Sequence, residues 1–134
     1  MQRVGLLLPV LLLAACGSEA PADPSGRDMF LRYCASCHGP EGRGDGPLAG
    51  SLTRPPADLT QLAKKSGGHY DERAVMSAID GRHRVVEHGT RDMPVWGAIF
   101  EEEGKGEPYP AYHSLLQSRL LVDYVATIQE PGDR

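Results

Sequence analysis

The chain has 134 residues, which is enough for one small domain. Its formal net charge is −4, and such mild acidity gives no sign of nucleic-acid binding. Aromatic residues make up 6% of the chain, whereas it has 16 Gly and 11 Pro, so we expect much loop and a thin core. A small domain with so thin a core often needs a cross-link or a buried cofactor.

The first predicted element is an export signal over residues 1–15. It has a positive start at Arg3, an apolar run over residues 5–13 and small residues before Cys16. The apolar run is too short to span a bilayer as a mature helix. The stretch LAACG resembles the bacterial lipobox, in which the cysteine becomes the lipid-modified first residue. We therefore expect a lipid on Cys16 that holds the protein at a membrane surface.

Residues 16–25 are predicted to be the lipidated cysteine and a tether. The stretch GSEAPADP is polar and contains two prolines. Fully extended, these eight residues reach at most about 28 Å. The domain that follows should therefore stay close to its membrane.

A first helix is expected to start at Ser25, with Asp28 three residues later as its capping-box partner. It leads into the sequence CASCH at residues 34–38. Two thiols at this spacing can add across the two vinyl groups of one porphyrin, and a histidine directly after them can bind its iron. CASCH therefore predicts one haem c attached covalently through Cys34 and Cys37, with His38 as an axial ligand.

Two other interpretations of Cys34 and Cys37 are a redox CxxC motif and half of a zinc site. A thioredoxin-like motif belongs in a βαβ pattern, which the chain lacks. A zinc site of this type needs a second Cys/His pair at suitable spacing, and none is present. The haem interpretation is therefore favoured.

The chain after CASCH is rich in Gly and Pro over residues 39–56, which predicts a loop that wraps the haem edge. Asp58 is placed to cap a short helix that ends near residue 66. Asp71 is placed to cap a second helix, which Gly81 ends.

The last third of the chain should contain two more helices. A short one is expected after Pro94, followed by an exposed acidic loop over residues 101–110. The strongest helical pattern covers residues 111–129, where apolar side chains recur every four residues. These side chains are Leu116, Leu120, Tyr124 and Ile128, with Leu121 and Val125 beside them. No convincing strand is predicted, and the expected fold class is all-α.

The other axial position of the iron is predicted to be filled by Met93. This methionine stands in a loop directly before Pro94, where no helical packing role is evident. A thioether is a soft ligand suited to haem iron, and His/Met coordination raises the reduction potential. His88 or His83 in its place would give a bis-His haem of lower potential, and both alternatives remain open.

Together these features resemble a bacterial class I, or monohaem, cytochrome c of the lipoprotein type. The matching residues are Gly26 and Phe30 in the first helix, CASCH at 34–38, Gly46-Pro47, Met93-Pro94, and Leu120 and Tyr124 in the last helix. The resemblance implies a small all-α cytochrome c fold over residues 26–130, with helices packed around one covalently attached haem.

The resemblance also implies roles for individual residues. Gly26 would let the first helix approach Tyr124 in the last. A proline carbonyl, best matched by Pro47 with Pro55 and Pro56 as the alternatives, would accept a hydrogen bond from the other ring nitrogen of His38 and orient the ring. Trp96 is expected to pack in the core; alternatively, its indole N–H would donate to a haem propionate.

The expected function is electron transport on the periplasmic side of a bacterial membrane. The protein would carry single electrons between redox proteins of a respiratory chain, with no catalytic residues and no small-molecule substrate. One alternative is an electron-transfer subunit of a larger oxidase or dehydrogenase. Another is a gas-binding haem sensor, which requires an empty or labile axial site on the iron.

Overall fold

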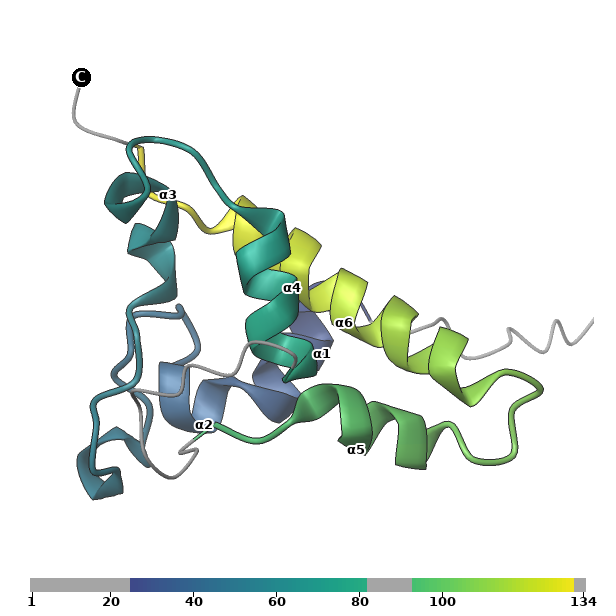
Figure 1. The fold of residues 1–134 in the computed structure, drawn as a ribbon. Helices are drawn as coiled ribbons and strands as arrows, with labels where there is room; N and C mark the ends of the chain where they lie inside the picture. The colour runs from purple at the N-terminus through teal and green to yellow at the C-terminus, as the bar shows by residue number, and fades with distance from the viewer. Residues whose placement is uncertain (1–24, 82–92, 132–134) are drawn as a thin grey trace, which may run out of the picture.

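The computed structural model describes residues 25–81 and 93–131, and within these ranges all regular elements are helices (Figure 1). The α-helices are α1 (Gly26–Tyr33), α2 (Ala35–His38), α3 (Leu62–Lys65), α4 (Glu72–Asp80), α5 (Trp96–Glu103) and α6 (Pro110–Thr127). Two short 3-10 helices, η1 (Ala49–Ser51) and η2 (Leu59–Gln61), lie in the loops between α2 and α3. The predicted all-α class is confirmed.

Helix α1 begins as its sequence predicts. The side chain of Ser25 accepts a hydrogen bond of 3.2 Å from the backbone N–H of Asp28, and the Asp28 carboxylate accepts one of 3.2 Å from the backbone N–H of Ser25. Each side chain thus satisfies a backbone donor that the first turn leaves unpaired. The Ser25 hydroxyl also donates to the Asp28 carboxylate at 2.6 Å, and this bond, together with the one from the Ser25 backbone N–H, holds the pKa of Asp28 below its usual value.

Helix α1 packs closely against α6 at Gly26, as the family resemblance implies. A Cβ at Gly26 would collide with the backbone carbonyl oxygen of Leu120 and would lie 2.9 Å from Cβ of Tyr124. One turn further along α1, the rings of Phe30 and Tyr124 lie 5.1 Å apart. The start of α1 can therefore lie directly on the backbone of α6 because residue 26 has no side chain.

Replacing Gly26 with alanine should destabilise the protein by about 1–3 kcal/mol. The added methyl group would collide with the backbone of α6 at Leu120, which can move only if the helix shifts as a whole. Denaturant unfolding would measure the loss. The control is Gly50→Ala, since a Cβ at Gly50 meets nothing within 4 Å. Equal stabilities for the two variants would contradict this account of the α1–α6 contact.

The predicted last helix is α6, and its buried face includes only part of the apolar pattern that predicts it. The buried residues are Ser118, Leu121, Val122 and Val125, whereas Leu116 is 45% exposed. A row of residues four apart drifts around an α-helix by about 40° at each step, because one turn takes 3.6 residues. The predicted row therefore leaves the core at Leu116, whereas Leu121 and Val125, which were predicted beside it, lie in the core.

Helices α4 and α5 pack beside α6 (Figure 1). Helix α4 is capped by Asp71 and followed by Gly81, as predicted. Helix α5 continues to Glu103, so residues 101–103 are exposed as predicted, but their assignment to a loop was wrong. Phe100 is fully buried, and this tertiary packing extends the helix through an acidic stretch that local signals assign to a loop.

Several predictions fall outside the described residues. The signal peptide, Cys16 and most of the tether lie within residues 1–24, and His83 and His88 lie within residues 82–92. In the described ranges, 25–81 and 93–131, no helix combines the length and the apolar character needed to cross a bilayer.

Candidate haem site

The sequence CASCH forms a single helical turn directly after α1. The backbone N–H groups of Cys37 and His38 both donate to the carbonyl of Cys34, at 3.1 and 2.9 Å. Cys34 is buried, while Cys37 and His38 are half-buried. The turn therefore holds both thiols and the imidazole close together at the end of one rigid element.

The Gly/Pro-rich segment folds back onto this turn. The N–H of Gly44 donates to the carbonyl of His38 at 2.8 Å, and the N–H of Gly46 donates to that of Cys37 at 3.1 Å. The N–H of Leu48 donates to the carbonyl of Ser36 at 2.9 Å. These three bonds fix the predicted wrapping loop to the attachment turn.

The ring of His38 is oriented by a backbone carbonyl. Its Nδ1 lies 2.9 Å from the carbonyl oxygen of Ala57. A carbonyl can only accept, so Nδ1 must carry the proton and Nε2 keeps its lone pair. Burial lowers the pKa of His38, partly opposed by this hydrogen bond. The imidazole is therefore neutral, oriented and able to bind a metal through Nε2.

Ala57, and not Pro47, supplies this carbonyl, which corrects the sequence prediction. The residues on either side of Pro47 are bonded to the CASCH turn, and Pro47 itself is exposed. The chain reaches the His38 ring ten residues later, directly after Pro55-Pro56. The sequence signal for this position was Pro55-Pro56, which the sequence alone did not rank above Pro47.

The surroundings of the thiols argue against the other interpretations of the motif. Burial, with a smaller effect from Cys37, raises the pKa of Cys34 to about 12, whereas redox CxxC motifs work through a lowered thiol pKa. Across residues 25–81 and 93–131, no cluster of three or more His, Cys, Asp or Glu side chains could hold a metal ion. The described residues therefore lack the further Cys or His ligands that a zinc site of this type requires in addition to Cys34 and Cys37.

A comparison with known protein families identifies the family to which this chain belongs. A family model described as "Cytochrome C oxidase, cbb3-type, subunit III" matches residues 21–106, more than half of the chain. The chain belongs to this cytochrome c family. The cytochrome has no significant match among curated proteins or among solved structures.

Membership has direct consequences for the chemistry of the cytochrome. Domains of this type bind haem c and transfer electrons through it, and their partners are redox proteins. They are generally exported to the periplasmic side and are generally not enzymes. The oriented, neutral His38 beside two thiols fits such a group, since it offers a nitrogen ligand next to both attachment atoms.

Met93 of the cytochrome lies just before α5. It is half-buried and packs against the core cluster, which includes Cys34 and Phe100. Trp96 packs as expected: its ring stacks on Phe100 at 6.0 Å and meets Tyr33 edge-on at 5.4 Å. The packing role of Trp96 is thus confirmed, and its contact with a propionate remains a prediction.

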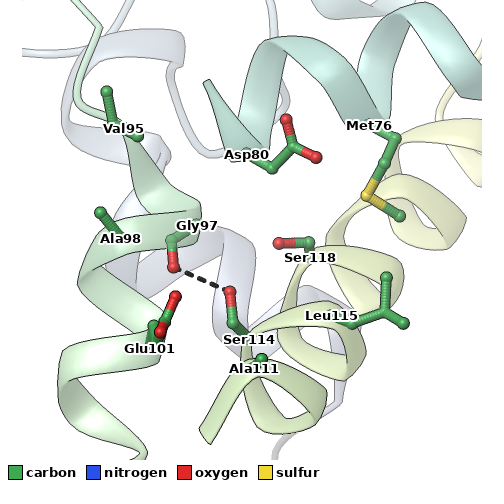
Figure 2. A pocket seen from close by; sticks show the side chains of 10 residues that line it. All are labelled: Met76, Asp80, Val95, Gly97, Ala98, Glu101, Ala111, Ser114, Leu115 and Ser118. Carbon is green, nitrogen blue, oxygen red and sulfur yellow. Dashed lines mark hydrogen bonds between the residues drawn. The ribbon is translucent and has the colours of Figure 1, made fainter. Parts of the chain in front are cut away.

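A separate cleft of about 260 Å³ lies between α4, α5 and α6 of the cytochrome (Figure 2). Met76, Gly97 and Ser118 are among its lining residues. The hydroxyl of Ser114, on α6, donates to the carbonyl of Gly97, on α5, at 2.8 Å between these two lining residues. No residue of the CASCH turn lines this cleft, so it is distinct from the candidate haem site.

Proposed function

We propose that this protein is an exported, lipid-anchored monohaem cytochrome c that carries single electrons between redox partners of a respiratory chain. The observation that carries the proposal is the hydrogen bond from His38 Nδ1 to the carbonyl of Ala57. It leaves Nε2 free next to two thiols, which is the arrangement that an attached haem requires.

In this proposal, Cys34 and Cys37 hold one haem through thioethers, and His38 and Met93 are its axial ligands. The haem supplies a reversible Fe(III)/Fe(II) couple. The carbonyl of Ala57 keeps the His38 ring in one orientation and makes its nitrogen more basic. Because α2 and the loop bonded to it hold His38 in place, little reorganisation should accompany electron transfer.

Support for Met93 comes from its chemistry and its position. Its thioether is a soft donor, and Pro94 restricts the backbone that presents it. It packs on the same core cluster as Cys34. With protein ligands on both faces of the haem, a small-molecule substrate has no open iron position, so the proposed role is transport and not catalysis.

The proposed membrane attachment is a lipid on Cys16. Its support is the lipobox-like sequence LAACG and the polar tether that follows it. Two or more acyl chains give a stable anchor, so the domain would remain at the periplasmic face of the membrane. Encounters with partners would use small, charge-steered interfaces, usually below about 1,200 Å².

A second candidate function is an electron-transfer subunit of a larger oxidase. It is favoured by the description of the matching family, which refers to a subunit of a cbb3-type cytochrome oxidase. Mild detergent extraction followed by size-exclusion chromatography separates the two roles. Stable co-elution with a terminal oxidase supports the subunit role, and elution as a free small protein supports a shuttle.

Covalent attachment can be tested by extracting the denatured protein with acid and organic solvent. We expect the pigment to stay with the natural chain, because thioether bonds survive denaturation. The double variant Cys34→Ser/Cys37→Ser should release its pigment or contain none. Cys16→Ser is the control: it should keep the pigment but move from the membrane fraction to the soluble fraction. Extractable pigment in the natural protein would exclude the proposed haem attachment.

A further inference from the structure

Tyr33, the last residue of α1, contacts α5 along its whole length. Its ring meets Trp96 edge-on at 5.4 Å and Phe100 edge-on at 5.2 Å. Its hydroxyl donates to the carboxylate of Glu103 at 2.9 Å. These partners are four and then three residues apart, so they lie on one face of α5. One side chain thus joins the end of α1 to residues at the start, in the middle and at the end of α5.

Tyr33 and the α5 residues that it contacts each lie close in sequence to one of the two proposed iron ligands. Tyr33 directly precedes Cys34, and His38 follows five residues later on the turn that α1 leads into. On the other side, Met93 stands three residues before Trp96, where α5 begins. The contact therefore links the element that presents His38 to the element that presents Met93.

We propose that Tyr33 is a positioning residue for Met93: it holds the start of α5 against the attachment segment, so that the thioether stays within reach of the iron. This inference rests on the proposed His38/Met93 ligation. Without the ring of Tyr33, α5 would still pack on α6, but it would lose two aromatic contacts to the attachment segment, one at Trp96 in its first turn and one at Phe100.

The aromatic ring should matter more than the hydroxyl. Glu103 is exposed, and a hydrogen bond at the surface contributes little because water competes for both groups. Tyr33 itself is half-buried, and edge-on ring pairs stabilise a specific geometry beyond the area that they bury. Burial and Glu103 both raise the pKa of Tyr33, so the hydroxyl remains a donor at neutral pH.

The test compares Tyr33→Leu with Tyr33→Phe in the haem-loaded protein. Two readouts are the weak long-wavelength absorption band of sulfur bound to iron(III) and the affinity of the oxidised protein for added imidazole. In Tyr33→Leu, we expect a weaker absorption band and imidazole binding that is about tenfold tighter. The two lost ring contacts would no longer favour the Met93-bound state, and together they change the equilibrium between bound and displaced Met93 by about a factor of ten. Tyr33→Phe keeps the ring and should stay close to the natural protein in both readouts.

The matched control is Tyr124→Leu, which removes a ring contact of 5.1 Å between α1 and α6 without touching α5. It should lower stability towards denaturant while leaving imidazole affinity unchanged. Equal imidazole affinities for Tyr33→Leu and Tyr124→Leu would overturn the proposal. If Tyr33→Leu does not fold, Phe100→Leu removes one of the same contacts from the α5 side and should tighten imidazole binding in the same direction.

Failure of this inference can be told apart from failure of the ligand assignment by including Met93→Ala. If Met93 is not the ligand, the natural protein and Met93→Ala will have the same spectrum, and both proposals fall. If Met93→Ala loses the band but Tyr33→Leu keeps it with unchanged imidazole affinity, Met93 is the ligand and only the role of Tyr33 is refuted.

Discussion

Replacing Met93 with alanine is expected to remove the long-wavelength absorption band of the oxidised protein and to lower its reduction potential. The methyl group of alanine cannot bind iron, so one axial position becomes open to water or to added ligands. A thioether stabilises the reduced iron, and axial ligands tune haem potentials over roughly 0.8 V in all. The fall should therefore be large, and a redox titration with parallel spectra would measure it.

Met76→Ala is the matched control for this substitution. Met76 is also half-buried and packed against the core, but it lies within α4. Met76→Ala should lower the free energy of unfolding by no more than about 2–5 kcal/mol, the usual cost of truncating a core methionine. It should leave the long-wavelength absorption band in place. An unchanged spectrum in Met93→Ala would assign the ligand elsewhere, with His88 and His83 as the next candidates.

Replacing Gly46 with alanine is expected to be among the most damaging changes in the loop that folds onto CASCH. A Cβ at Gly46 would lie 2.5 Å from the carbonyl oxygen of Ser36, 2.6 Å from that of Ala35 and 2.6 Å from the carbonyl carbon of Cys37. All three are backbone atoms of the attachment turn. The loop would have to move away, at a cost of about 1–3 kcal/mol or more, and would lose its bond to Cys37.

Gly50→Ala again provides the control, because Gly50 belongs to the same loop and has open space where its Cβ would point. Denaturant unfolding of the haem-loaded variants should show a loss for Gly46→Ala and a change within about 0.5 kcal/mol for Gly50→Ala. A Gly46→Ala protein as stable as the natural one would show that the loop does not need its close approach to CASCH.

Local chemistry made several features predictable from the sequence. The capping box of Ser25 and Asp28 and the Asp71 cap depend on side chains that bond to backbone within three residues, so neighbouring residues are sufficient to specify them. The same holds for CASCH, where both thiols and the imidazole occupy one helical turn. A motif that is local in sequence is also local in space, and for this reason the sequence alone carries the family resemblance.

The features that the sequence did not determine all depend on contacts between distant segments. Ala57 lies 19 residues along the chain from His38, whose ring it orients. Only the path of the loop between them determines which carbonyl lies within hydrogen-bond distance of His38 Nδ1. Glu103 stays helical because α5 packs its Phe100 into the core and meets Tyr33 from α1, 70 residues earlier. The buried side of α6 is chosen by the helices packed on it. Sequence periodicity specifies that a face exists, but tertiary packing decides which residues that face contains.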